Sequence, residues 1–319
     1  MQIRFYVVLI IGLLFLSCGE TSKVEKEIAS ITVDFEVERF DKAFFKAKPK
    51  DLPKLKSNYP FFFSNDPDTF WIEKINDSLQ HELLKEVQHT FPDFENSKKE
   101  LKDLFQHLKY YDKTFKTPRV ITLTNDVAYR DKTIVNDSLV LIALDNYLGA
   151  EHQFYQNIPM YLAANMDKNQ MISDVAEDYA KKYVYQTSRK TLLDEMIYFG
   201  KLLYFKDVMI PFKTDAEKIG YTDTQINWAI ANESPIWSYF IEKELLYDTD
   251  PKLPNRFIAD APFSKFYLEL DNDSPGRLGQ YIGWQIVRAY AEQTNEDIMK
   301  IMQTEPQVIF NKSKFKPKK

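Results

Sequence analysis

The segment Pro275-Gly-Arg-Leu-Gly-Gln-Tyr-Ile-Gly-Trp-Gln-Ile-Val-Arg-Ala-Tyr290 carries the clearest packing signal in this chain, because it holds three of the eight glycines. Gly279 and Gly283 are four residues apart, so on a helix they share one face. Glycine costs a helix about 1 kcal/mol relative to alanine, and it is kept where another backbone must approach closely. We therefore predict that this face packs tightly on a neighbouring helix.

The helix predicted over residues 189–206 is the best candidate for that neighbour. It is rich in apolar residues, and Gly200 lies within it as the facing small position. A phosphate-binding loop is the alternative interpretation of the glycines. The spacing Gly-x-x-Gly-x-x-x-Gly, however, matches no nucleotide-binding fingerprint, so helix packing is favoured.

Helical patterns dominate after residue 170, and strand patterns cluster before residue 145. Helices are predicted at residues 171–185, 189–206, 223–232, 235–247, 276–293 and 294–303. Strands are predicted at residues 31–37 and 119–123 and in a hairpin of residues 133–135 and 139–144. The order indicates an α+β fold that is predominantly α-helical. We expect a small N-terminal antiparallel or mixed sheet followed by a helical bundle.

Three finer predictions concern the ends of elements. Residues 71–90 carry one apolar stripe and predict a single helix. Ser274 followed by Pro275 predicts an N-cap at the start of the 276–293 helix, with proline at the first helical position. The lysine-rich end of the chain, residues 312–319, predicts a frayed and solvated terminus.

The N-terminus has the pattern of a bacterial lipoprotein signal. Arg4 precedes an apolar run over residues 5–16, and Ser17 and Cys18 follow it. The run is too short for a spanning helix, which needs about 20 apolar residues. In a lipoprotein the peptide is cut before the cysteine, whose thiol then carries a diacylglyceryl group. We assign residues 1–17 to a signal peptide, 18–29 to a flexible polar tether and 30–319 to a single globular domain.

Composition narrows the classes of function. The formal net charge is −5 at pH 7, and removal of the signal peptide takes away one Arg and no acidic residue. This acidic balance argues against a nucleic-acid partner, which requires a basic face. Cys18 is the only cysteine, so no disulfide is predicted. No two of the four histidines have a standard zinc-ligand spacing.

Asp194-Glu-Met-Ile-Tyr198 places two polar side chains four residues apart on one helix face. Zinc peptidases use the same frame as His-Glu-x-x-His, in which two imidazoles bind metal and the Glu takes a proton from the attacking water. Here Glu195 keeps the Glu position, while Asp194 and Tyr198 stand where the histidines would be. Glu233, on a later helix, lies where such enzymes often place a third ligand.

Three interpretations of this frame are open: an ordinary amphipathic helix, a former metallopeptidase helix without metal, and a working metal site. The working site would need Asp194, Tyr198 and Glu233 as ligands, and the tyrosine would have to lose its proton at high cost. We therefore predict no catalytic residue, no metal and no cofactor. Arg277 and Arg288 could meet the two acidic residues of the frame across the helix contact.

Several motifs support a family resemblance over nearly the whole mature chain. They are Arg39-Phe-Asp41, Tyr59-Pro-Phe-Phe62, Leu104-Phe-Gln-His-Leu-Lys-Tyr-Tyr111, Leu144-Asp-Asn-Tyr-Leu-Gly149, Asp194-Glu-Met-Ile-Tyr-Phe-Gly-Lys-Leu-Leu-Tyr204, Asn232-Glu-Ser-Pro-Ile-Trp237, the Pro275–Tyr290 segment and Ser313-Lys-Phe-Lys-Pro317. Together they resemble the gliding motility lipoprotein GldB family. That family is in turn similar, distantly, to metal-less zincin-type relatives of predicted zinc peptidases. The resemblance thus implies a degenerate zincin-like fold and a pseudo-enzyme, and it supplies only Cys18 as a site residue.

The resemblance implies an envelope lipoprotein required for gliding. We expect a non-enzymatic component or assembly factor that contacts envelope proteins of the gliding and type IX secretion machinery. Its lipid would anchor it in the outer membrane, facing the periplasm. Two alternatives are a divergent hydrolase, metallopeptidase-like or peptidoglycan-active, that uses Glu195 with Asp194 and Glu233, and a periplasmic binding module. The module would have an aromatic-lined pocket near residues 194–204 and 275–290.

Lipidation gives the first testable prediction. Labelled palmitate should enter the wild-type protein and should not enter Cys18→Ser, because the substitution removes the only thiol in the chain. Each buried methylene of an acyl chain adds about 0.8 kcal/mol to membrane binding, so the variant should also leave the membrane fraction. Equal labelling of the two proteins would contradict the lipoprotein assignment.

Overall fold

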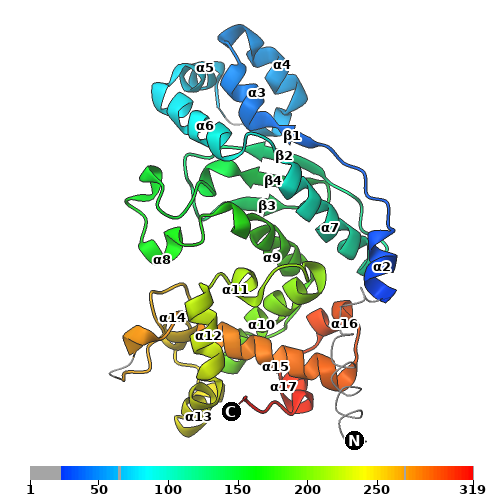
Figure 1. The fold of residues 1–319 in the computed structure, drawn as a ribbon, viewed down its shortest axis with the longest axis vertical. Coiled ribbons are helices and arrows are strands. Elements are labelled where there is room, and N and C mark those ends of the chain that lie inside the picture. The colour runs from blue at the N-terminus through cyan, green and yellow to red at the C-terminus, as the bar shows by residue number, and fades with distance from the viewer. Residues whose placement is uncertain (1–22, 64–65, 269–270, 319) are drawn as a thin grey trace, which may run out of the picture. The chain divides into compact units, whose positions relative to one another are not determined.

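The computed structural model describes residues 23–63, 66–268 and 271–318, and it places a four-stranded mixed sheet among helices (Figure 1). The strands are β1 (Val37–Arg39), β2 (Arg119–Leu123), β3 (Thr133–Val135) and β4 (Leu139–Ala143). The strand order is β1-β2-β4-β3, in which β1, β2 and β4 run parallel and β3 runs antiparallel to β4. The predicted small sheet is therefore confirmed and is mixed.

Helices connect the strands of this sheet and follow it. Those between β1 and β2 are α3 (Phe40–Lys46), α4 (Leu52–Asn58), α5 (Asp68–Asn76), α6 (Ser78–Thr90) and α7 (Glu95–Tyr111). Those after β4 are α8 (Met160–Ala163), α9 (Met171–Tyr183), α10 (Leu192–Met209), α11 (Asp215–Ile219), α12 (Asp223–Ala231), α13 (Glu233–Glu242), α14 (Leu253–Phe257), α15 (Leu278–Thr294), α16 (Ile298–Gln303) and α17 (Pro306–Ser313). The fold is α+β and predominantly helical, as predicted.

The hairpin of β3 and β4 forms where the sequence predicts it. Asn136 makes the turn, because its side-chain oxygen accepts hydrogen bonds from the backbone N–H groups of Ser138 and Leu139. Val120 of β2 pairs with Val140 of β4, and both are fully buried. Such continuous burial is typical of parallel strands that are covered on both faces.

The first strand is shorter than predicted. The alternation over residues 31–37 predicts a strand there, but only Val37–Arg39 pairs with β2. The chain turns into α3 directly afterwards. Asp41, which is 1% exposed, accepts hydrogen bonds from the Arg39 guanidinium and from the Thr122 hydroxyl of β2. This buried carboxylate fixes the position at which β1 ends.

Two predicted helix boundaries are wrong, and in both cases local hydrogen bonds explain the difference. Residues 71–90 form two helices, because Asp77 leaves the helical conformation and accepts hydrogen bonds from the first N–H groups of α6. Ser274 does not cap α15. Its hydroxyl bonds to the carbonyls of Ser264 and Asp271 instead, and Arg277, in the left-handed conformation, precedes the helix.

Part of the predicted flexible tether is helical. Helix α2 (Lys23–Ala29) occupies residues that we assigned to a flexible tether. Contacts separate a unit that ends at Thr32 from a compact unit Val33–Lys319. The signal peptide and Cys18 lie outside the described residues. Among the helices that are described, none has both the length and the apolar character needed to cross a bilayer.

Helix α15 crosses α10 at direct backbone contact (Figure 1). A Cβ atom on Gly283 would lie 1.8 Å from the Met196 carbonyl oxygen, and one on Gly200 would lie 2.4 Å from the Gly283 carbonyl carbon. Gly279 belongs to another contact, because its Cβ atom would lie 2.8 Å from the Phe257 carbonyl oxygen of α14. The expectation that Gly279 faces α10 is therefore wrong.

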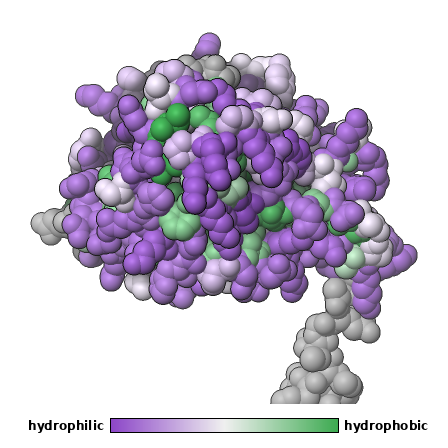
Figure 2. All heavy atoms as spheres, turned by 90° about the horizontal axis from the view of Figure 1, so that it is seen from above, coloured by the Kyte–Doolittle hydropathy of each residue, from purple (hydrophilic) through white to green (hydrophobic). Residues whose placement is uncertain are grey.

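Two hydrophobic clusters hold different parts of the fold, and the larger one contains the α10–α15 crossing itself. The larger joins α10 to α17 around fully buried residues such as Trp284 of α15. The smaller joins α3 to α6 with the β2 residue Ile121. Burial of each large side chain contributes about 1.5–3 kcal/mol. The face seen from above in Figure 2 is mostly hydrophilic, with small hydrophobic patches between polar side chains.

The crossing of α10 and α15 gives a stability prediction. Gly283→Ala should lower the free energy of unfolding by about 1–3 kcal/mol, the usual cost of overpacking. The better helix propensity of alanine, about 1 kcal/mol, opposes this loss but cannot remove a clash with backbone. The measurement is the denaturant midpoint. Glu292→Ala, at an exposed position of the same helix, is the control, and an unchanged midpoint for Gly283→Ala would contradict the close crossing.

Candidate functional site

Asp194, the first position of the metallopeptidase-like frame, is the third residue of helix α10. Its carboxylate accepts hydrogen bonds from the backbone N–H groups of Lys190 and Thr191, at 3.0 Å each. The Thr191 hydroxyl in turn accepts from the Asp194 N–H at 3.2 Å. This reciprocal pair is a capping box, which satisfies N–H groups that a helix leaves free at its start. Asp194 therefore has a structural role in starting the helix.

Glu195 and Tyr198 share one partner, Arg189. The Arg189 Nε donates to Glu195 at 2.9 Å, and the guanidinium carbon lies 3.6 Å from the centre of the Tyr198 ring. An arginine in this position forms both an ion pair and a cation–π contact. The carboxylate that a peptidase would use as a base is thus paired with a cation from the segment just before the helix.

Glu233 is buried elsewhere, at the first position of α13, and is 1% exposed. It accepts hydrogen bonds from the Tyr281 hydroxyl of α15 at 2.9 Å and from the Lys318 backbone N–H at 2.8 Å. Burial and the nearby Glu233 charge both raise the pKa of Tyr281, so the phenol stays protonated and donates. Glu233 thereby connects α13, α15 and the C-terminal segment.

The C-terminal segment, described up to Lys318, is docked and not frayed as we predicted, although its lysines are exposed to solvent as expected. The Phe315 ring packs edge-on against Trp237 of α13, with ring centres 5.2 Å apart. Lys318 follows with its hydrogen bond to Glu233. The aromatic contact and the bond to a buried carboxylate hold the backbone of this segment, while its lysine side chains remain in water.

The structure does not bring the four frame residues into one site. Asp194, Glu195 and Tyr198 are held at the start of α10, and Glu233 is held by Tyr281 and the tail. Within the described parts of the chain, no three His, Cys, Asp or Glu side chains are grouped so that they could hold a metal ion. The residues of the frame therefore stabilise helices and their contacts.

A second expectation placed an aromatic-lined pocket near residues 194–204 and 275–290. The close contact at Gly200 and Gly283 leaves no room for a pocket where those helices cross, and from residues 275–290 Gly276 and Arg277 line the hollows described below. A cleft of about 540 Å³ lies elsewhere in the described structure, and we call it the polar cleft. Its walls come from α8, α9, the ends of α10 and α11, residues 129–133 and the residues around Asp260 and Arg277.

Paired charges form one wall of the polar cleft, on α9, α10 and α11. Lys206, 3% exposed, donates from Nζ to the Glu177 carboxylate and to the Lys218 carbonyl, at 2.9 Å each. Burial would raise the pKa of Glu177, but the positive charges of Lys206 and Lys181 hold that pKa below its usual value of 4.5. Glu177 is therefore ionised at neutral pH and anchors Lys206.

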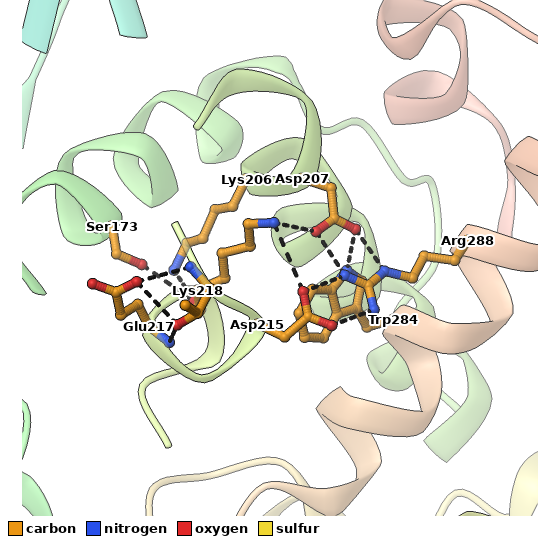
Figure 3. A network of polar contacts seen from close by, with 9 residues as sticks. Ser173, Lys206, Asp207, Asp215, Glu217, Lys218, Trp284 and Arg288 are labelled. Atoms are coloured by element: carbon orange, nitrogen blue, oxygen red, sulfur yellow. Dashed lines mark hydrogen bonds and ion pairs between the residues drawn. The ribbon is translucent and has the colours of Figure 1, made fainter. Parts of the chain in front are cut away.

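A charged network behind this wall joins three helices (Figure 3). Arg288 of α15 pairs with Asp207 of α10 at 2.7 Å and with Asp215 of α11 at 2.8 Å, and Lys218 reaches Asp207 at 3.0 Å. Trp284 donates from its indole N–H to Asp207 at 2.8 Å. Burial would raise the pKa of Asp215, but the hydrogen bonds from Arg288 lower it below its usual range.

These partners decide the arginine contacts that the sequence left open. Arg277 and Arg288 could have met Asp194 or Glu195, and in the structure Arg288 pairs with Asp207 and Asp215. Arg277 donates to the Gly220 carbonyl at 2.9 Å and pairs with Asp260 at 3.4 Å. The sequence signal for this network is the adjacent Lys206-Asp207 pair, which follows the apolar and aromatic run Leu202–Phe205 of α10.

Comparison with known proteins adds a family match. Residues 21–317 match the family model described as gliding motility protein GldB. That range covers most of the chain, including the polar cleft and the α10 frame. Neither the curated proteins nor the solved structures include a match to this chain.

The Glu177–Lys206 pair gives a prediction for stability. Glu177→Gln should lower the free energy of unfolding at pH 7 by about 1–3 kcal/mol, because Lys206 then has no carboxylate to balance its buried charge. The wild-type pair should weaken as pH falls below 4.5, since the unfolded chain then binds a proton that folded Glu177 resists. The variant should lose this acid dependence.

The measurement is chemical denaturation at several pH values between about 3 and 7. Removing one titrating group should flatten the acid limb by at most about 1.36 kcal/mol per pH unit. Glu82→Gln, at an exposed position of α6, is the matched control and should follow the wild type. Parallel curves for wild type and Glu177→Gln would contradict the role of the ion pair.

Proposed function

This chain belongs to the GldB family of gliding motility proteins, and we propose that it works there as a non-enzymatic lipoprotein of the cell envelope. In this proposal it is a component or assembly factor near the gliding and type IX secretion machinery, and it acts through contacts with other envelope proteins. Lipid on Cys18 would hold it to the outer membrane on the periplasmic side.

The observation that supports a non-enzymatic role is the use of the α10 frame. Asp194 caps the helix, Glu195 pairs with Arg189, and Glu233 binds the C-terminal segment. A general base must reach the proton that it removes, whereas each of these carboxylates already accepts hydrogen bonds that hold the fold. A protein that supports a machine through contacts needs such a scaffold and no exposed acid–base pair.

A complementation experiment tests the proposal in cells that lack the gene. Glu195→Gln should restore gliding, because the amide preserves the shape of the side chain and an ion pair at a helix surface contributes only about 0.2–1 kcal/mol. Arg189→Gln is the matched control, since it removes the same ion pair from the other side. The readouts are colony spreading and the amount of protein in the envelope fraction.

The two variants separate a structural from a catalytic role. Under the proposal they behave alike, and both glide when their protein levels are normal. Loss of gliding in Glu195→Gln, with normal protein level and with Arg189→Gln active, would overturn the proposal. That result would favour a divergent hydrolase that uses Glu195.

A further inference from the structure

The polar cleft continues into a second hollow of about 270 Å³. The residues that line both hollows are Tyr161, Asn165, Gln170, Gly220, Asp260 and Arg277. Because the shared residues come from α8, η5 (Lys168–Gln170), the end of α11 and the segment before α15, the two hollows form one extended trough. A trough of this kind suits a chain-like ligand better than a single ion.

Most of the charges that line the trough are matched to one another. The ion pairs are Lys132–Asp174 at 2.7 Å, Lys181–Asp178 at 3.1 Å, Lys206–Glu177 at 2.9 Å and Arg277–Asp260 at 3.4 Å. Three have partners of another kind: Lys218 pairs with Asp207 outside the lining, Arg130 lies over the Tyr129 ring with 5.8 Å to its centre, and Asp167 accepts from the Asn169 N–H. An anionic ligand would be repelled by the carboxylates, and a cationic ligand would be repelled by the lysines and arginines. A neutral ligand with both donors and acceptors can bond to the outer atoms of these pairs without separating them.

Amide groups add donors and acceptors at fixed positions. Gln170 donates from its side-chain nitrogen to the Glu217 carbonyl at 3.1 Å, which holds its amide at the wall. The Asn165 amide lies over Gly220, where a Cβ atom would come within 2.9 Å of its nitrogen. Gly220 also has φ +70°, a conformation that side chains rarely adopt. The absence of a side chain at Gly220 therefore leaves room for the Asn165 amide.

Three aromatic rings complete the lining: Tyr129, Tyr161 and, in the second hollow, the buried Tyr221. Tyr161, on α8, is 37% exposed, so its ring is open to a ligand. Aromatic rings bind flat apolar faces, and tyrosine keeps a polar tip for hydrogen bonding. Sugars present such a face of C–H groups beside a rim of hydroxyls.

We propose that the trough binds an oligosaccharide, a neutral polyhydroxylated chain that stacks on Tyr161 and bonds to the amides and paired charges. This site is separate from the α10 frame and involves no bond cleavage. The inference goes beyond the protein contacts proposed above, and either can hold without the other.

Titration calorimetry tests the proposal on the full-length lipoprotein in a detergent without a sugar head group. The probes are the N-acetylglucosamine tetramer and cellotetraose, which share the polyhydroxyl chemistry and differ in the acetamido group. Inorganic phosphate and tetra-alanine represent the competing anion and peptide classes. Saturable binding of either sugar supports the proposal, and the sugar that binds more tightly shows whether the natural oligosaccharide carries acetamido groups. Binding of phosphate or peptide alone, or of none of the four, overturns it.

Tyr161→Ala assigns the binding to the trough. We expect at least about tenfold weaker sugar binding, which corresponds to about 1.4 kcal/mol. Tyr185→Ala is the matched control, because Tyr185 is 61% exposed and lies outside the trough lining. Thermal melting of both variants verifies folding. Equal affinity of Tyr161→Ala and wild type for the sugar would overturn the placement of the site.

Discussion

Backbone contact between α10 and α15 is the constraint on which the helical part of this protein depends. Gly200 and Gly283 let the two helices touch where any side chain would collide with backbone. The crossing sets the position of every group that α15 carries. Arg288 reaches Asp207 and Asp215 on one side, and Tyr281 reaches Glu233 on the other. Small changes in this one distance would therefore affect several helices together.

The charged network is a consequence of that crossing. Buried ion pairs often contribute little net stability, because removing charges from water costs about as much as their attraction returns. Removing one partner of a buried pair is nevertheless strongly destabilising, because it leaves an unpaired charge in the interior. A network in which every charge is paired therefore favours one arrangement of the helices over its alternatives. Asp207 accepts from Lys218, Trp284 and Arg288, and it thereby fixes α11 against α10 and α15. The same fixation places the α11 end and Gly220 at the polar cleft.

The α10 frame shows how neighbours decide what a motif does. A carboxylate at the Glu195 position is catalytic where metal ligands and an open approach surround it. Here Arg189 occupies its oxygens, Asp194 serves as a helix cap, and Glu233 is buried under the C-terminal segment. The polar cleft, by contrast, lies at the opposite, C-terminal end of α10, where Lys206 lines it. The region open to a small ligand is thus distinct from the region that resembles a peptidase.

Local patterns in the sequence determine the elements themselves. Some features depend only on residues that are near one another in the chain, so they can be recognised from the sequence alone. They are the periodicity of β2 and the hairpin, the apolar helices after residue 170 and the glycines of α15. Only the tertiary structure decides the partners, because contacts between distant residues depend on the whole arrangement. Arg288 meets Asp207 and not Glu195, Gly279 meets α14 and not α10, and the lysine-rich end docks on Glu233. The polar cleft follows the same rule, since its walls come from segments far apart in the chain and exist only when packing brings them together.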